Sequence, residues 1–536
     1  MIGKRRPAMQ LFLVVLLAWS NVSAFTESER YGGALNYGEY GRASTFDPIT
    51  GNDMITLRMT ELLFNGLVGI SEKQEIVSEL AKSWKITDNG QVYTFVLRDD
   101  VLWHKGSDGI AHRFTADDVK ATFDVMMHPK TITPLKVRYE FIDKVKVIAK
   151  YKVTFYLKRP VLNGLAKFTF KIIPRHALRN PEYLTRDDPF VQHPVGTGPY
   201  YIKKITAANE VIFQANDKYF GGRPYIDNFV ALPFADQNVM NQALAFNTID
   251  MVVQVNPRHI PELQGDKRIV LKPYNALSYA FFGYNLRNPL LSDKRVRKAF
   301  ALAINRKEML KSFFNDQGTL ISGPFAPGSW AYNLDVKPLP FDQRQARELL
   351  SEAGFQMNSR RILEKYGKEL SLNLKVPIAK ENEALKRVVL AFKGYLRRIG
   401  VKINVQFLEW QAWKEAIFLR QDFDIMFAQW VFDDSADISS LFHSGEIGPW
   451  KNNFGGYSNA HIDRLITEAK LTLDHEKRRT INRRLHRELA EEAPYTFLWT
   501  LTNYAAYNKK LRRVAIHPYK FFSYSNKWFL TPDERN

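Results

Sequence analysis

The sequence predicts an α/β protein built from more than one domain. Runs of alternating apolar and polar residues, typical of strands, occur between amphipathic helical patterns along its whole length. No internal repeat or low-complexity stretch interrupts this alternation, which argues against an all-helical or all-β fold. The chain has 536 residues. That length suggests roughly two to four domains.

Residues 1–24 have the pattern of a secretory signal peptide. Lys4–Arg6 form a basic start, Leu11–Trp19 form a short apolar run, and Val22–Ala24 supply the small residues of a cleavage site. The apolar run is too short to span a bilayer, which takes roughly 20 residues. A buried N-terminal helix is the alternative. We expect removal after Ala24 and a soluble exported protein.

The chain has no cysteine and a strong positive charge. An exported chain without cysteine has neither disulfides nor a lipid-bearing cysteine, so we expect a periplasmic location. Without Lys4–Arg6, the chain has 73 basic and 56 acidic side chains, which gives a formal charge of +17. The basic residues are dispersed, and their densest clusters, Lys477–Arg479 and Lys509–Arg513, are short. This pattern in an exported protein argues against a nucleic-acid partner and favours acidic ligands or an anionic membrane surface.

The first predicted element is a β-hairpin near residue 90. Trp84–Thr87 and Val92–Leu97 alternate apolar and polar residues, and Asn89-Gly90 lies between them. Because Asn-Gly tolerates positive φ angles, this dipeptide predicts a tight type I′ turn.

A capped helix is predicted to follow. Thr115 stands three residues before Asp118, a variant of the capping box with Asp in place of Glu or Gln. Val119, Phe123 and Met126 then share one helical face, which predicts that this face is buried.

The block Gly196–Asp227 predicts a turn, a strand and a second turn. Gly196 and Gly198 permit a sharp turn before a strand at Tyr200–Ile205, and glycine and proline at 221–224 mark the second turn. A Gly-rich loop is also a candidate phosphate site. However, this block lacks the lysine and the following helix start of a P-loop.

Two helices with structural roles are predicted further along. Ser292 is expected to cap the first, whose apolar face carries five residues. These are Val296, Ala299, Phe300, Ala303 and Ile304. The second lies within Phe341–Phe355 and is expected to end at Gly354 as its C′ residue.

These blocks together resemble the family 5 extracellular solute-binding proteins, the peptide-binding subunits of ABC importers. The amino-acid sequences of four blocks resemble those of the family and occur in the same order. These blocks are Leu80–Phe123, Gly196–Asp227, Tyr284–Leu310 and Phe341–Phe355. The resemblance implies a periplasmic binding protein type II-like fold with two lobes built from three domains. Two crossing strands near Tyr274–Asn285 and Thr500–Tyr507 would form the hinge. It implies domain I at 25–71, 195–273 and 505–536, domain II at 72–194 and domain III at 274–504.

The resemblance also implies a site for the α-ammonium group of a peptide. In peptide binders of this family, a strand ends in a tryptophan followed three residues later by an aspartate. Here the strand is Phe423–Gln429, the tryptophan is Trp430 and the aspartate is Asp433. A buried ammonium must be paired and hydrogen-bonded, so one carboxylate at the edge of a closed cleft fits the chemistry.

Four acidic residues gather in this region, and three interpretations of them compete. Asp424, Asp433, Asp434 and Asp437 lie between aromatic residues. Their spacing fails the alternate acidic positions and central glycine of a calcium-binding loop. A solvated acidic turn and a ligand site remain.

The same comparison assigns Trp413 and Arg420 to the pocket. An arginine there binds a C-terminal carboxylate or an acidic side chain bidentately, although a surface helix arginine is the alternative. Phe427 replaces a second arginine expected before the tryptophan. The sequence therefore does not identify the group that binds the C-terminus of the ligand.

On the opposing lobe, the family offers backbone groups that pair with the ligand like an added strand. This segment is Thr50–Ile55 here, so Asn52 and Asp53 are candidate ligand residues. Phe281 on a crossing strand is a further candidate, with a core role as the alternative.

The function predicted from these observations is peptide capture for an ABC permease, with energy from a separate ATPase. The expected protein is a monomer without cofactor or metal. A non-peptide ligand, such as a nickel chelate, an opine or an oligosaccharide, is the alternative within the same fold. A hydrolase is not supported, because the sequence has no His-Glu-x-x-His, no Gly-x-Ser-x-Gly and no cysteine nucleophile.

Overall fold

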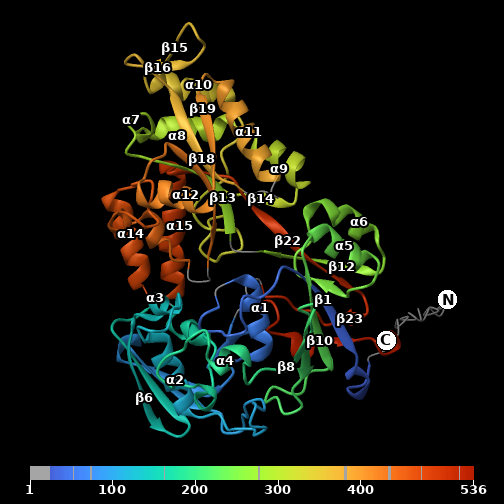
Figure 1. Ribbon diagram of the computed structural model, residues 1–536. Coiled ribbons are helices and arrows are strands. Elements are labelled where there is room, and N and C mark those ends of the chain that lie inside the picture. The colour runs from blue at the N-terminus through green and yellow to red at the C-terminus, as the bar shows by residue number, and fades with distance from the viewer. Residues whose placement is uncertain are drawn as a thin grey trace, which may run out of the picture.

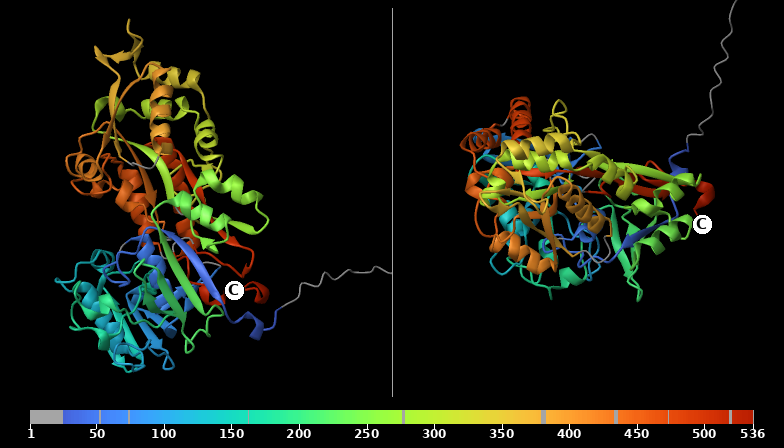
Figure 2. Two further views of the ribbon diagram at one scale, coloured as in Figure 1. Left: turned by 45° about the vertical axis from the view of Figure 1, so that its right-hand side comes forward. Right: turned by 90° about the horizontal axis from the view of Figure 1, so that it is seen from above.

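The protein is a mixed α/β molecule with three principal sheets. The computed structural model describes residues 25–51, 53–72, 75–161, 163–275, 278–378, 383–432, 436–472, 474–517 and 520–535. Figure 1 shows an eight-stranded sheet at the lower right, a four-stranded sheet at the lower left and a five-stranded sheet above both. We call the first two sheets with their helices the lower half, and the five-stranded sheet with its helices the upper half. Figure 2 shows the same division from the side. The predicted α/β class is confirmed.

The eight-stranded sheet organises the lower half. In spatial order its strands are β12 (Ile269–Asn275), β22 (Trp499–Asn508), β11 (Met251–Val252), β1 (Ala34–Tyr40), β10 (Asn228–Phe234), β9 (Val211–Ala215) and β8 (Tyr200–Ile205), while β14 (Gly318–Leu320) pairs with the start of β22. Helix α1 (Met54–Leu63) packs into the core on one face. Helices α5 (Gln237–Ala245) and α6 (Ile260–Gly265) pack on the other.

The four-stranded sheet contains the predicted hairpin. Its strands in order are β4 (Ala81–Thr87), β5 (Val92–Leu97), β7 (Lys152–Leu157) and β6 (Ile142–Ala149). The pairing of Thr87 with Val92 leaves four residues in the connection. Asp88, Asn89 and Gly90 all have positive φ. The hairpin is therefore confirmed, but the two-residue type I′ turn is wrong, because three left-handed residues in succession make a wider loop.

The capped helix beside this sheet is confirmed. It is α2 (Ala116–Met127), and the carboxylate of Asp118 accepts a hydrogen bond from the backbone N–H of Thr115 at 2.8 Å. Val119, Phe123 and Met126 are buried in the core of the four-stranded sheet. Short helices α3 (Leu135–Tyr139) and α4 (Pro189–Gln192) and the strand pair β2 (Val68–Ile70) and β3 (Ile76–Ser78) complete this region.

Gly196 and Gly198 are required by close contact. Neither has a positive φ angle. A Cβ on Gly196 would lie 1.8 Å from the carbonyl oxygen of Leu63, at the end of α1. The imidazole of His104 accepts a hydrogen bond from the N–H of Gly196 at Nδ1 (3.2 Å), and Nε2 lies 3.0 Å from the carbonyl oxygen of Gly198. The chain bends at Thr197–Pro199, directly before β8, as predicted. The glycines are needed there for close contact with the end of α1, not for a positive φ angle.

The five-stranded sheet organises the upper half. Its strands in order are β19 (Lys402–Leu408), β18 (Ser371–Pro377), β20 (Ile425–Val431), β13 (Ser278–Tyr284) and β21 (Tyr495–Phe497). One face packs on α8 (Lys294–Ala303), α9 (Arg306–Phe314), α10 (Gln343–Glu352) and α11 (Glu383–Arg397). The other packs on α12 (Trp410–Lys414), α13 (Ser439–Phe442), α14 (Ala460–Leu471) and α15 (His475–Glu492). The remaining elements are α7 (Pro289–Ser292), β15 (Gln356–Met357), β16 (Leu363–Lys365), β17 (Lys368–Glu369), β23 (Leu511–Arg512) and β24 (Phe529–Leu530).

The predicted apolar face of α8 is buried, but its cap differs from the prediction. Asp293 is the N-cap, and its carboxylate accepts a hydrogen bond from the N–H of Arg295 at 2.9 Å. Ser292 instead ends α7, and its hydroxyl donates to the carbonyl oxygen of Pro289. A carboxylate also complements the positive N-terminus of a helix better than a hydroxyl does. In α10, Gly354 follows the C-cap with φ +88°, as predicted.

The chain passes between the two halves along β12 and β22. β12 ends at Asn275, and β13 begins the next sheet at Ser278. β22 pairs with β14 at its start and with β12 from Thr502 onward. No helix within the described ranges combines the length and the apolar character that a membrane span needs.

Candidate functional site

In the eight-stranded sheet, the parallel strands β1 and β10 end on the side that faces the crossing. Tyr40 and Phe234 are their paired last residues. β1 is parallel to β11, and both β11 and β12 are antiparallel to β22. β1 therefore runs in the same direction as β12, which ends at Asn275 opposite Thr502. The carboxyl ends of β1 and β10 therefore point toward the segments that join the two halves.

In the five-stranded sheet, the carboxyl ends of the parallel strands also lie on the side of the crossing. β18, β19 and β20 are parallel and end at Pro377, Leu408 and Val431. Val431 pairs with Ser278, the first residue of β13 after the crossing. In open α/β sheets, ligands bind in the crevice outside the carboxyl ends of the strands. We therefore locate the candidate site between these two edges.

An aromatic cluster lies at the end of β20. Phe281 stacks on Tyr495 at 4.2 Å between ring centroids and on Trp430 at 5.9 Å, and Phe454 stacks on Tyr495 at 5.8 Å. Phe281 is completely buried, whereas Trp430 is half-buried. Phe281 therefore supports Trp430 from the core. Sequence reasoning missed Phe454 and Tyr495, which lie in segments distant from the motif.

Trp413 lies on the same side of the sheet as Phe281 and is buried as well. Its side chain is 3% exposed, and its indole N–H donates to the carbonyl oxygen of Lys375 at 3.3 Å. Trp410 stacks on it at 5.2 Å and 15° and is 57% exposed. The surface indole at the carboxyl end of β19 is therefore Trp410, which the sequence comparison did not select.

Arg420 lies at the opposite end of β20 from Trp430. It follows a π-helical turn at Glu415–Leu419, which extends α12. Its half-exposed guanidinium contacts the carboxylate of Glu415 at 3.4 Å. The structure therefore does not bring Arg420 and Trp430 together at the carboxyl edge.

Asp53 is the N-cap of α1, and most of its hydrogen-bonding capacity is used within the chain. Its carboxylate accepts from the N–H of Thr56 at 2.8 Å and from the hydroxyls of Thr56 and Ser44 at 2.6 and 2.5 Å. Burial alone would raise the pKa of Asp53, but these hydrogen bonds outweigh it and lower that pKa. Asn52 lies outside the described residues.

Two further ion pairs hold α1 in place. Arg58 binds Glu39 bidentately, with Nε–Oε2 and Nη2–Oε1 distances of 2.9 and 2.8 Å. The hydroxyl of Tyr37 donates to the same carboxylate. Burial and the neighbouring Glu39 raise the pKa of Tyr37 well above its usual value. At the other end of α1, Glu61 accepts from the ammonium of Lys171 at 2.9 Å.

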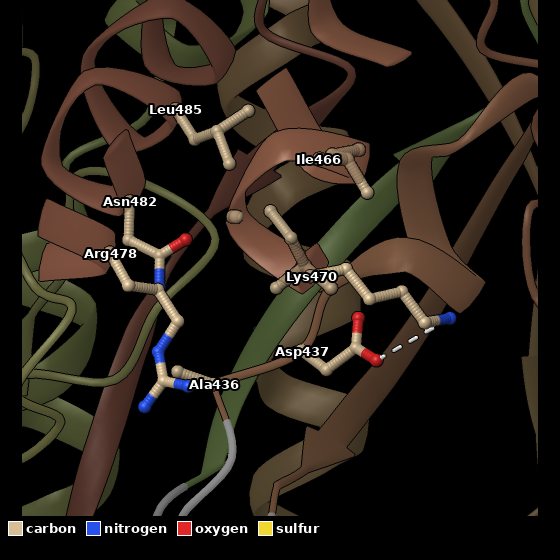
Figure 3. A pocket seen from close by; sticks show the side chains of 9 residues that line it. Ala436, Asp437, Ile466, Lys470, Arg478, Asn482 and Leu485 are labelled. Atoms are coloured by element: carbon tan, nitrogen blue, oxygen red, sulfur yellow. Dashed lines mark ion pairs between the residues drawn. The ribbon is translucent and has the colours of Figure 1, made fainter. Parts of the chain in front are cut away.

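Asp433 and Asp434 lie outside the described residues, but their neighbourhood is described from Ala436 onward. Figure 3 shows Asp437 directed toward Lys470, and Arg478 beside Ala436. The ammonium of Lys470 lies 3.9 Å from the carboxylate of Asp437, and the pocket between these side chains has a volume of only about 10 Å³. Asp437 also accepts a hydrogen bond from the N–H of Ser439 at 2.8 Å.

The fourth carboxylate of the acidic group has a structural role. Asp424 accepts from the amide of Asn288 at 2.7 Å and from the N–H of Asn373 at 2.8 Å. Among the residues that the structure describes, no three His, Cys, Asp or Glu side chains gather closely enough to hold a metal ion.

A groove of about 150 Å³ lies at the carboxyl ends of β1 and β10, and no sequence motif marked it. Helix α1, the loop after β1 and the β8–β9 hairpin surround it. Its lining residues are Glu39, Gly41, Arg42, Ala43, Phe46, Ile55, Met59, Ile205, Asn209, Val211, Ala231 and Pro233. Most of these residues are apolar and form no motif in the sequence, because they come together only through sheet pairing and the packing of α1.

Comparison with known proteins decides the family. The profile of the bacterial extracellular solute-binding proteins, family 5 Middle, matches residues 75–449. The chain belongs to this family. Among family 5 relatives, the oligopeptide-binding protein AppA of Bacillus subtilis is 29% identical over 508 residues, which cover 93% of this chain and 92% of the relative.

Another relative and a solved structure extend this comparison. The di/tripeptide-binding protein 2 of Pseudomonas aeruginosa is 26% identical and covers 81% of this solute-binding protein and 83% of the relative. The structure of AppA from Bacillus subtilis in complex with a nonapeptide superposes with a TM-score of 0.75 at 28% identity. That match covers 94% of this chain and 99% of the AppA chain.

Proposed function

We propose that this solute-binding protein captures peptides between two lobes and delivers them to an ABC permease in the inner membrane. The observation that carries the proposal is the meeting of two carboxyl edges, from β1 and β10 below and from β18, β19 and β20 above. Similarity to an oligopeptide-binding protein and to a nonapeptide complex supports peptide as the ligand class.

The proposed lobes are built from three domains, and domain I is made of three separate segments of the chain. Domain I comprises 25–71, 195–273 and 505–536, with domain II at 72–194 inserted, and domain III is 274–504. β12 in one sheet and β13 in the next follow each other along the chain, and β22 pairs with both β14 and β12; both observations support two hinge strands. Rotation about them would close the lobes over a ligand.

Within this cleft, Asp433 would bind the α-ammonium group of the peptide, and Trp430 would lie against the first residue. Trp410 would extend the wall with Trp413 packed behind it, and Arg420 would meet an acidic group that reaches the far end of β20. The stack behind Trp430 supports this arrangement, because it fixes the ring that precedes Asp433 by three residues.

In this proposal, the protein is a periplasmic monomer without catalytic activity. It would bind its cargo unchanged, and the permease with a separate ATPase would perform transport. The signal-peptide pattern of residues 1–24 supports export.

Mass spectrometry of ligands released from the natively purified protein tests this proposal. A set of short peptides, recovered intact and bound again with a defined affinity, is the expected result. A single metabolite without an amino group would contradict peptide capture. Cleavage of added peptides would contradict the carrier role.

A further inference from the structure

Most side chains that line the groove at the carboxyl ends of β1 and β10 are apolar. Ile55 and Met59 enter it from α1, Val211 and Ala231 from the sheet, and Phe46 from the loop after β1. Met59, Val211 and Ala231 also belong to the buried core beneath the groove. The floor is therefore a fixed surface of the core, not a flexible loop.

The one carboxylate in this lining does not act as a free charge. Glu39 is 4% exposed and is bound bidentately by Arg58. Because the hydroxyl of Tyr37 donates to it as well, the carboxylate is neutralised and largely satisfied within the protein. The groove therefore offers no anion to a positively charged group.

The charge that remains at the groove is positive. Arg42 is exposed, and within the described part of the chain it makes no ion pair or hydrogen bond. A lysine or arginine side chain entering the groove would meet this guanidinium without a compensating carboxylate. Like charges brought together in a partly desolvated site disfavour binding.

The protein leaves this apolar surface accessible to solvent. Ile205, at the tip of the β8–β9 hairpin, is 46% exposed, and Ile55 and Phe46 are partly exposed. The groove has a volume of about 150 Å³, which is enough for one aliphatic or aromatic side chain. Since the groove opens on the edge that faces the crossing strands, it adjoins the region where the ligand is proposed to lie.

We propose that this groove is a subsite for one apolar side chain of the bound peptide, and that Arg42 excludes cationic side chains from it. The inference rests on the proposed function and adds a preference to it. Burial of one leucine or phenylalanine side chain raises affinity by roughly tenfold or more.

A peptide scan tests the subsite. Penta-alanine and its single-residue leucine, phenylalanine and lysine variants are titrated against the full-length mature protein by calorimetry. We expect one position at which leucine or phenylalanine raises affinity about tenfold and lysine lowers it. An equal affinity for all residues at every position would overturn the inference.

Three variants assign that position to the groove. Ala43→Trp fills the groove and is expected to abolish the preference for leucine while the affinity for penta-alanine changes less than threefold. Ile205→Ser, at an exposed position, is expected to reduce the preference about threefold. Arg42→Ala is expected to restore binding of the lysine peptide. Ala460→Trp adds the same bulk at an exposed position on α14 and is the control.

The outcomes separate this inference from the proposed function. If the wild-type protein binds no peptide, peptide capture itself fails. If peptides bind and a preference exists but survives both Ala43→Trp and Ile205→Ser, the groove is not the subsite. A preference that disappears in the Ala460→Trp control as well would also contradict the assignment.

Discussion

At the residue scale, burial separates side chains that the family pattern groups together. Phe281 and Trp413 are almost fully buried, Trp430 is half-buried, and the carboxylate of Asp53 is occupied by the cap of α1. A motif records which residues recur at a site but not which atoms face the ligand. Contact with a peptide is therefore expected of Trp430 and Trp410 rather than of the rings behind them.

Asp433→Ala is expected to lower peptide affinity at least tenfold. Loss of one partner from a buried charge pair typically costs about 2–5 kcal/mol. The unliganded melting temperature should change little, because the paired ammonium belongs to the ligand. Calorimetry and thermal unfolding measure the two effects.

Asp437→Asn is the matched control. Its carboxylate is engaged by Lys470 and by the N–H of Ser439, so this variant should affect stability more than affinity. Unchanged affinity in Asp433→Ala would remove that residue from the site.

His104 is expected to make the stability of the protein depend on pH. Burial lowers the pKa of its imidazole to about 4, against 6.5 when unfolded. The neutral ring is favoured in the folded state, so its contribution is complete above pH 6.5 and is lost as the pH falls from 6.5 to 4. The loss amounts to about 3 kcal/mol at pH 4.

Denaturant unfolding at several pH values checks this expectation. His104→Gln should be less stable at pH 7 and show a flatter dependence between pH 6.5 and 4. Parallel curves for the variant and the wild type would show that His104 does not titrate on unfolding.

At the element scale, local patterns identified several elements, whereas contacts between elements explained the special residues. The hairpin, the capped helix α2 and the apolar face of α8 follow from signals within a few residues. The roles of Gly196 and Gly198 do not, because the carbonyl groups that they approach belong to α1. The four-residue hairpin loop likewise depends on strand register, which Asn-Gly alone does not set.

Gly196→Ala is expected to destabilise the protein by about 3 kcal/mol, the upper end of typical overpacking costs. The added methyl group would overlap the carbonyl oxygen of Leu63 and displace the end of α1. Urea unfolding measures the change in free energy.

Gly265→Ala is the control for this glycine. It ends α6, and nothing lies within 4 Å of its added Cβ. It should leave stability unchanged or raise it by about 0.5–1 kcal/mol. Equal destabilisation by both variants would contradict the contact explanation.

At the scale of the whole molecule, the halves also touch away from the crossing strands. Arg478 on α15 donates to the amide oxygen of Asn163, 315 residues away, at 2.9 Å. Its guanidinium lies 4.8 Å from the ring centroid of Trp330 and is 2% exposed. Figure 1 shows α15 above the four-stranded part of the lower half, on the side opposite β12 and β22.

Asn163→Gly is expected to loosen closure of the halves. Glycine keeps the positive φ of this position, +49°, and removes only the amide that receives the charged hydrogen bond. The radius of gyration of the unliganded protein should rise, and peptide affinity should fall about tenfold. Small-angle X-ray scattering and calorimetry measure these effects.

Arg479→Ala is the control for this contact, since Arg479 is the partly exposed neighbour of Arg478 and pairs with Glu476. It should change neither the radius of gyration nor the affinity. A wild-type radius and affinity in Asn163→Gly would show that this contact does not hold the halves together.

The sequence by itself determined the family, the α/β class, the capped start of α2 and the buried faces of α2 and α8. Hydrogen bonds at helix ends and apolar periodicity are set within a few neighbouring residues, so they can be recognised without coordinates. The tertiary structure alone decided that Phe281 is core, that Trp410 is exposed and that an apolar groove lies between α1 and the β8–β9 hairpin. These features depend on the packing of segments that are distant along the chain, and no local pattern encodes that packing.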